Sequence, residues 1–151
     1  MSQKRSQQGN KSKKALRRAF MRAHIALYRL SGGLIGSRIA GRHFLLLTTT
    51  GRKSGRERVT PILYIPEAKN FLLIASNWGE AYAPAWWLNL QEHPQARVRV
   101  GRKTLVVIAR QARAEERAHL WPSIIARYKE FAHYQQQVER EIPVIILSPV
   151  N

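Results

Sequence analysis

The sequence lacks two residue types on which many functional sites depend. It has no Cys, and all nine of its acidic residues are Glu, so Asp is absent as well. Without Cys the chain forms no disulfide, no Cys-ligated zinc or iron–sulfur site and no thiol nucleophile. Without Asp it has no Ser-His-Asp triad and no Asp-rich loop for calcium or magnesium. The five His residues are scattered, and no pair has a spacing that suggests a metal site, so we predict none.

Acidic residues are also missing from the first third of the chain. The first is Glu57; residues 1–56 hold 14 Lys and Arg, whereas residues 57–151 hold 12 Lys and Arg against 9 Glu. The 151 residues suffice for one domain with its own core. A nearly balanced domain with a strongly basic front favours an anionic partner: nucleic acid, acidic lipid headgroups or an anionic ligand.

Long apolar runs are absent too. No stretch of the sequence approaches the ~20 apolar residues of a membrane span. Arg17-Arg18 resembles a twin-arginine export signal, but His24, Arg29 and Arg38 interrupt the apolar region that should follow. We therefore expect a cytoplasmic protein, either soluble or peripheral on the inner face of the cell membrane.

The basic front divides into three segments. Residues 1–14 are polar and predict a disordered basic tail. Residues 15–42 combine a basic amphipathic helix, which ends near Leu30, with a flexible glycine-rich linker. The apolar stripe of the helix recurs at steps of four and three residues, at Leu16, Phe20, Ala23, Leu27 and Leu30. This stripe suits either the domain's own core or an anionic membrane surface, and the two interpretations are compatible.

Residues 43–151 carry a β pattern with inserted helices. Short apolar segments bounded by turn residues predict six strands, at 44–49, 58–65, 71–76, 96–100, 104–109 and 142–147. Helical patterns cover 84–91, 113–128 and 130–139. Strands this closely spaced, without βαβ alternation, favour a mainly β fold: a six-stranded antiparallel barrel rather than a doubly wound parallel sheet.

The turn after the first strand predicts an anion-binding site. Residues 48–58 read TTTGRKSGRER, with two glycines, four cations and several hydroxyls. Glycines let backbone N–H groups point into one concavity, and Arg grips phosphate or carboxylate through paired hydrogen bonds. The spacing is not that of a Walker loop. A solvated basic turn and a contact with nucleic-acid phosphates are the alternatives.

Two aromatic groups complete the candidate site. Three of the four Trp lie within residues 78–87, and we expect Trp86 or Trp87 to be a core residue, because adjacent side chains point differently. Tyr128, Phe131 and Tyr134 step by three residues along one helical face. A phenol there can donate a proton to a substrate, but the spacing by itself favours an aromatic core stripe.

Together these motifs resemble the deazaflavin-dependent nitroreductase and quinone reductase family. The resemblance rests on TTTGRKSGRERVTP, ASNWG, PAWWLNLQEHP and REIPVIIL, in that order between residues 40 and 150. It implies a split β-barrel of the FMN-binding type with coenzyme F420, an 8-hydroxy-5-deazaflavin, as cofactor. It further implies hydride transfer from the reduced coenzyme to a quinone, an activated alkene or a nitro compound.

The resemblance also implies residue roles. The coenzyme carries a phosphodiester and a glutamate tail, so the family grips a polyanion. Matching positions make the cofactor-binding set Arg52, Lys53, Ser54, Arg58, Thr60, Pro61, Ser76, Asn77, Ala85, Trp86 and Asn89. The matching catalytic set is Ser76, Tyr128 and Tyr134, with Phe131 where a related enzyme has a third tyrosine.

Alternatives remain open on cofactor and partner. FMN is the second choice of cofactor, and FMN, haem or a lipid would fit the same barrel cleft. A basic nucleic-acid-binding module is the alternative from another class, disfavoured because most of the charge lies in the tail and helix. The resemblance further implies an N-terminal helix used at an anionic membrane surface, and a monomer or weak homodimer.

Overall fold

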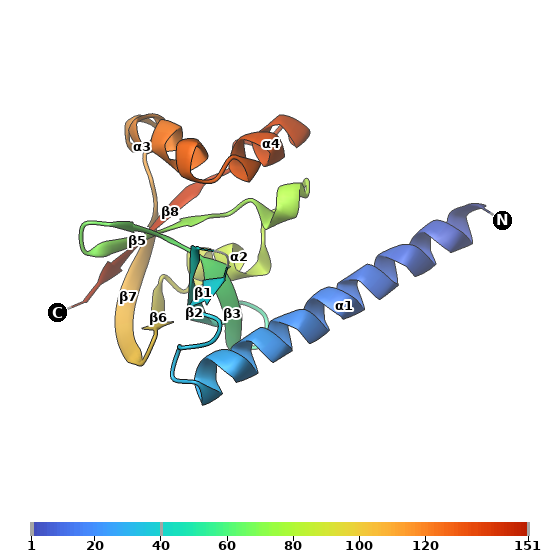
Figure 1. The fold of residues 1–151 in the computed structure, drawn as a ribbon. Coiled ribbons are helices and arrows are strands. Elements are labelled where there is room, and N and C mark those ends of the chain that lie inside the picture. The colour runs from blue at the N-terminus through green and yellow to red at the C-terminus, as the bar shows by residue number, and fades with distance from the viewer. Residues whose placement is uncertain (1, 40, 151) are drawn as a thin grey trace.

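The computed structural model describes residues 2–39 and 41–150, with side chains from residue 9 onward within these ranges, and it is built around one curled sheet (Figure 1). A long helix, α1 (Ser2–Leu30), precedes the sheet, and a 3₁₀ turn, η1 (Asn77–Gly79), and three helices are inserted in it: α2 (Ala85–Glu92), α3 (Ala114–Arg127) and α4 (Glu130–Gln137). The strands are β1 (Arg38–Ile39), β2 (Arg42–Thr50), β3 (Glu57–Leu63), β4 (Ile65–Glu67), β5 (Asn70–Ile74), β6 (Gln95–Val100), β7 (Lys103–Gln111) and β8 (Val144–Pro149).

The strand pairings close the sheet into a barrel. All pairs are antiparallel, and the order is β1-β2-β6-β7-β8-β5-β4. At the far end, β4 pairs with β5, while β3 pairs with β2, and only Tyr64 separates β3 from β4. The predicted mainly β antiparallel barrel is therefore confirmed. Its six predicted strands correspond to β2, β3, β5, β6, β7 and β8, and β1 and β4 are short additions.

Two cores lie on either side of β5 and β8. Successive residues of a strand point to opposite faces. Ile145 and Leu147 face the barrel interior, while Val144 and Ile146 face a second core beneath α3 and α4. These two helices lie together beyond β8 and β5, at the top of Figure 1. The uninterrupted apolar sequence from Val144 to Leu147 follows from burial on both faces.

Helix α1 begins earlier than predicted, and its position excludes one of the two interpretations of its apolar stripe. It begins at Ser2, so residues 2–14, predicted to be disordered, continue the helix; they contain no Pro and are rich in Gln and Lys, which are good helix formers. The predicted apolar stripe does not dock on the barrel: Leu16, Phe20 and Leu30 are 73%, 64% and 87% exposed. Within the described residues, no helix is long and apolar enough to cross a bilayer.

A different face of α1 packs on the barrel. The Tyr28 side chain is fully buried, its hydroxyl donates to the carbonyl oxygen of Arg99 at 3.0 Å and accepts from the N–H of Gly101 at 2.7 Å. One turn earlier, the His24 ring is buried and its Nε2 lies 2.7 Å from the carbonyl oxygen of Gly36. The apolar periodicity of the helix does not predict the burial of these two residues. Each side chain has a polar group, and such a group is buried only when it forms a hydrogen bond.

The linker after α1 is closely packed rather than loose. Gly33 has a φ of +87°, and a Cβ there would lie 2.3 Å from the Cα of Gly101. Gly36 has a φ of +98°, and a Cβ there would lie 2.8 Å from the His24 ring. The glycines that predicted flexibility are therefore required for close approach and a left-handed backbone.

Candidate ligand-binding cleft

A cleft of about 650 Å³ lies where α1, the β2–β3 turn, the outer part of β3 and α2 converge. Figure 1 shows how α1, in blue, runs past β3. The barrel side contributes Gly51, Arg52, Lys53, Ser54, Glu57, Arg58, Val59, Thr60, Ala85, Trp86 and Asn89. The helix side contributes Arg18, Met21, Arg22 and Ile25. We call these two groups the barrel wall and the helix wall.

The β2–β3 turn holds its shape through its own backbone. The N–H of Gly51 donates to the carbonyl oxygen of Arg56 at 2.8 Å, and the N–H of Gly55 donates to the carbonyl oxygen of Gly51 at 2.8 Å. The N–H of Arg56 donates to the Ser54 hydroxyl at 3.2 Å. A backbone anion nest was predicted here, but these N–H groups are already committed within the turn. The cations of this wall are the side chains of Arg52, Lys53 and Arg58.

A buried amide connects the turn to α2. Asn89 is 4% exposed, and its Oδ1 accepts from the backbone N–H of Arg52 at 3.1 Å and from the Arg52 guanidinium at 3.3 Å. Its Nδ2 donates to the hydroxyl of Thr49 at 3.1 Å. Buried polar groups of this kind are costly to leave unpaired, so Asn89 fixes Arg52 relative to the barrel.

The adjacent tryptophans of α2 have separate places, as predicted. Trp87 is buried in the barrel core, whereas Trp86 is half-buried and lines the cleft. With Ala85, Val59, Met21 and Ile25 it gives the cleft an apolar and aromatic part beside its cationic part. Such a combination suits a ligand with a planar ring and a charged chain.

Five cations surround the cleft without a carboxylate partner. In the part of the chain that the structure describes, Arg18, Arg22, Arg52, Lys53 and Arg58 form no ion pair. The single acid in the lining, Glu57, is paired with Arg97 at 2.5 Å. Like charges gathered around one cleft create a positive potential there, which favours an anionic ligand.

The helix wall was missed in the predicted site. The apolar stripe lies on the opposite face of α1, and its presence predicts that the arginines of the helix face solvent or a membrane. A usable signal was present: Lys11, Lys14, Arg18 and Arg22 recur at steps of three and four residues, which places them on one helical face.

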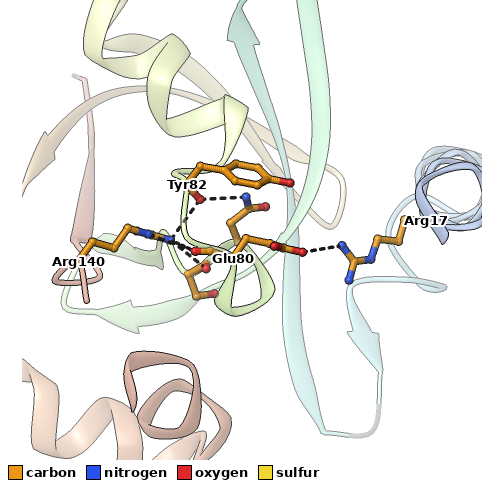
Figure 2. A network of polar contacts seen from close by, with 6 residues as sticks. Arg17, Glu80, Tyr82 and Arg140 are labelled. Atoms are coloured by element: carbon orange, nitrogen blue, oxygen red, sulfur yellow. Dashed lines mark hydrogen bonds and ion pairs between the residues drawn. The ribbon is translucent and has the colours of Figure 1, made fainter. Parts of the chain in front are cut away.

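A second polar network holds the loop after β5 (Figure 2). The Arg140 guanidinium donates to the carbonyl oxygens of Ala75, Ser76, Glu80 and Tyr82, at 3.1 to 3.4 Å. Burial lowers the pKa of the Arg140 guanidinium from its ordinary value. The loop needs such an anchor, because Asn77 and Trp78 have φ of +48° and +59°, an unfavourable region for residues other than Gly.

The same loop meets α1. The Glu80 carboxylate lies 3.9 Å from the Arg17 guanidinium (Figure 2). The same guanidinium lies 5.7 Å from the ring centroid of Trp78. Both contacts are largely exposed, so each stabilises the helix only weakly. They are nonetheless the contacts that align the middle of α1 with the loop.

The aromatic stripe near the C-terminus lies in the second core. Tyr128 is 5% exposed, and its hydroxyl has no hydrogen-bond partner among the described residues. The Arg42 guanidinium lies over its ring, 5.2 Å from the centroid. Tyr134 is half-buried at the edge of this core and approaches η1, since a Cβ on Gly79 would lie 3.0 Å from its ring.

The structure thus brings together part of the predicted site. Eight predicted cofactor-binding residues line the cleft: Arg52, Lys53, Ser54, Arg58, Thr60, Ala85, Trp86 and Asn89. Pro61 is the next residue along β3, opposite Leu46 of β2. Ser76 and Asn77 lie on the Arg140-anchored loop, and Tyr128 and Tyr134 on the neighbouring helical core, outside the lining of the cleft.

Relatives with known names and structures share this architecture. A sequence profile described as F420H(2)-dependent quinone reductase matches residues 20–149. An F420H(2)-dependent quinone reductase of Mycobacterium tuberculosis is 35% identical over 132 residues, 85% of this chain and 89% of its own. Another protein of that organism, provisionally given the same name, is 42% identical over 70% of this chain and 88% of its own.

Solved structures with the same fold include a reductase that uses the reduced deazaflavin. An F420-H2 dependent reductase, FDR-A, superposes with a TM-score of 0.64 at 36% identity, covering 70% of this chain and 93% of its own. A structure described as a domain-swapped dimer gives 0.66 at 29% identity and covers 93% and 98%. HutZ, a heme storage protein from Vibrio cholerae, gives 0.56 at 15% identity over 73% and 83%, which shows a common fold alone.

The barrel and its cation-lined cleft define a split-barrel oxidoreductase of the deazaflavin-dependent class. The chain belongs to the F420H(2)-dependent quinone reductase family.

Proposed function

We propose that the protein transfers hydride from reduced coenzyme F420 to a quinone, with activated alkenes and nitro compounds as further acceptors. The observation that carries the proposal is the cleft itself: five unpaired cations beside an aromatic, apolar surface, in a member of this family. A polyanionic coenzyme with a planar ring fits both parts of that lining.

The barrel wall supplies the coenzyme-binding groups in this proposal. Arg52, Lys53 and Arg58 bind phosphate and carboxylate groups, and Ser54 adds a hydroxyl donor. Trp86, Ala85 and Thr60 border the ring, with Pro61 leaving the strand one N–H short beside it. Asn89 acts through Arg52, which it holds in place.

The acceptor side of the site is assigned to the loop after β5 and the adjoining helical core. When bound, the reduced deazaflavin supplies a hydride, and the protein orients the acceptor and excludes water. Ser76, Asn77 and Tyr134 border this side, because the loop and α4 meet at η1. The Tyr128 hydroxyl has no hydrogen-bond partner in the described structure. It is a candidate proton donor beside Ser76 and Tyr134.

One titration tests the proposal. Purified protein is titrated with coenzyme F420, with FMN and with a polynucleotide, and oxidation of the reduced deazaflavin by menadione is followed by absorbance. We expect F420 to bind, FMN to bind more weakly, and menadione to be reduced. Binding of FMN alone would identify a different cofactor, and salt-sensitive binding of the polynucleotide alone would identify a nucleic-acid module.

The exposed apolar face of α1 supports membrane association as a separate proposal. Leu16, Phe20, Leu27 and Leu30 are 47% to 87% exposed on the same helix that carries Lys11, Lys14, Arg18 and Arg22. A helix of this kind lies in the headgroup region of an anionic bilayer, where a lipophilic quinone is accessible. Sedimentation with anionic vesicles tests this: Leu16→Ser/Phe20→Ser should abolish co-sedimentation, and equal sedimentation of the variant would contradict it.

The oligomeric state is proposed to be a monomer or a weak homodimer. Analytical ultracentrifugation over a hundredfold concentration range measures it directly, and a tight dimer at the lowest concentration would contradict the proposal.

A further inference from the structure

Helix α1 presents two different faces. Arg18, Met21, Arg22 and Ile25 line the cleft. Leu16, Phe20 and Leu27 are exposed, and the helical repeat of 3.6 residues places them roughly opposite the cleft-lining group. The helix that resembles a membrane anchor is therefore also one wall of the ligand-binding cleft.

The basic part of the cleft-facing side continues beyond the cleft. Lys14 and Lys11 precede Arg18 by four and seven residues, so they lie on the same face. We call Lys11, Lys14, Arg18 and Arg22 the basic row. At 1.5 Å per residue it extends about 16 Å along the helix. Figure 1 shows this N-terminal part of α1 projecting away from the barrel, so the row leads outward from the cleft.

Charge balance argues that the row has an anionic partner. Its four members are exposed and form no ion pair in the described structure; the one acid in the cleft lining, Glu57, is paired with Arg97, and Glu80 is paired with Arg17. Arg18 and Arg22 face Arg52, Lys53 and Arg58 across one cleft. A ligand that carries several negative charges would be attracted by both sides at once.

We propose that the basic row binds the distal, anionic portion of the ligand, so that the ligand bridges the barrel wall and the helix wall. The inference rests on the proposed function, because the ligand is then a deazaflavin with a phosphodiester and a chain of carboxylates. Arg18 and Arg22 bind the charges next to the barrel, and Lys14 and Lys11 bind successive carboxylates farther out. Longer tails then bind more tightly, up to the length of the row.

A ligand that bridges the two walls would also strengthen the attachment of α1 to the barrel, which is weak at the middle of the helix. The helix is held firmly at Tyr28, whereas the Arg17–Glu80 contact is a 3.9 Å exposed pair. A ligand bound to both walls adds ion pairs that exist only in the docked position. Ligand binding should therefore order α1 against the barrel.

The test separates tail binding from ring binding. The full-length protein and its Arg18→Gln/Arg22→Gln variant are titrated calorimetrically, at low salt, with two probes: coenzyme F420 and the deazaflavin riboside, which has no phosphate and no glutamates. Lys13→Gln/Lys69→Gln removes two exposed charges that do not line the cleft and is the matched control. Circular dichroism verifies the fold of each variant.

We expect the arginine variant to bind coenzyme F420 about tenfold more weakly, as two partly exposed ion pairs would predict. It should bind the riboside as the wild type does. Lys11→Gln/Lys14→Gln should bind the coenzyme with one glutamate normally and lose the affinity gained with longer tails.

Three results would overturn the inference. Unchanged affinity for coenzyme F420 in Arg18→Gln/Arg22→Gln, with a large loss in Arg52→Gln/Arg58→Gln, would remove the helix wall and leave the proposed function intact. An equal loss for both probes would show that α1 shapes the cleft without binding the tail. Failure of the wild type to bind either probe would overturn the proposed function itself.

Discussion

The two walls of the cleft carry the same kind of charge but are held in different ways. On the barrel wall, the turn from Gly51 to Arg56 is closed by its own hydrogen bonds and tied to α2 by the buried amide of Asn89. On the helix wall, the cations stand on one helix whose firm attachment is at Tyr28, near its C-terminal end. The described contacts of α1 near Arg17 are exposed.

The difference teaches where preorganisation lies. The barrel wall holds the backbone of its turn and Arg52 in a fixed arrangement, so less conformational entropy is lost there when an anion binds. The helix wall rests on fewer buried contacts and is expected to open locally at lower free energy. A rigid wall suits the constant part of a ligand, and a mobile wall suits a part that varies in length.

The largest predicted effect on stability comes from a substitution in the linker that joins the helix wall to the barrel. Gly33→Ala should lower the free energy of unfolding by about 3 kcal/mol, because a Cβ would lie 2.3 Å from the Gly101 backbone at a φ of +87°. Gly41→Ala is the control, with a similar φ of +77° and no atom within 4 Å, and should cost about 1 kcal/mol. Urea denaturation measures both, and equal losses would contradict the close approach.

The second largest effect comes from a substitution that removes the hydrogen bonds of the barrel wall. Asn89→Ala should cost about 2 kcal/mol, because the Thr49 hydroxyl and the Arg52 N–H lose a buried partner. It should also weaken coenzyme binding by freeing Arg52. Gln91→Ala, at an exposed position of the same helix, should change neither stability nor binding. If both alanine variants bind the coenzyme like the wild type, Asn89 does not position the turn.

A milder change separates the helix from the barrel. Tyr28→Phe removes the hydroxyl that joins α1 to Arg99 and Gly101, and should cost about 1 kcal/mol. Hydrogen exchange should then accelerate in α1 and remain unchanged in β2. Tyr82→Phe, at a 58% exposed residue, is the control and should have no effect. Uniform acceleration across the barrel would show that α1 is not a separate cooperative unit.

The smallest predicted effect concerns an ion pair that lies outside both walls of the cleft, so its removal should not change ligand binding. The Arg110 guanidinium pairs with both oxygens of Glu116, at 2.7 and 2.9 Å, and lowers the pKa of that carboxyl from 4.5 to about 2, with help from the Arg113 N–H. Because the folded-state pKa is lowered, this stabilisation is present above pH 4.5 and is lost as the pH falls toward 2.

Glu116→Gln should therefore flatten the pH dependence of stability between pH 4.5 and 2 and leave the coenzyme affinity unchanged. Urea denaturation at several pH values measures it, with the exposed neighbour Glu115→Gln as control. An unchanged pH profile in Glu116→Gln would contradict the ion pair.

The barrel was predictable because its determinants are local. Each strand is a short apolar segment between turn residues, and β8 shows its double burial as an unbroken apolar run. The barrel wall was predictable for the same reason, since the turn and α2 each form one continuous motif. Segments of this kind carry their structure in their own sequence.

The helix wall and the Arg140 anchor depend on long-range partners. Either of two faces of α1 could be buried, and the outcome rests on Arg99 and Gly101, more than 70 residues from Tyr28. Arg140 lies 58 to 65 residues beyond its acceptors, and nothing near it in sequence indicates them. Polar groups that bury only when paired leave no apolar period to detect.

The Arg140 anchor has a consequence for how this family can diversify. Its acceptors are main-chain oxygens, which every amino acid provides, so the contacts of Arg140 do not depend on which side chains the loop from Ala75 to Tyr82 carries. Asn77 is different, because its Nδ2 donates to the carbonyl oxygen of Tyr82 at 3.1 Å and its φ is +48°. Substitution of the exposed Tyr82 can therefore change the surface that we propose contacts the quinone, while Arg140 keeps its hold on the backbone. Arg140 itself tolerates no such exchange, because Lys has a single nitrogen and cannot span four carbonyl groups.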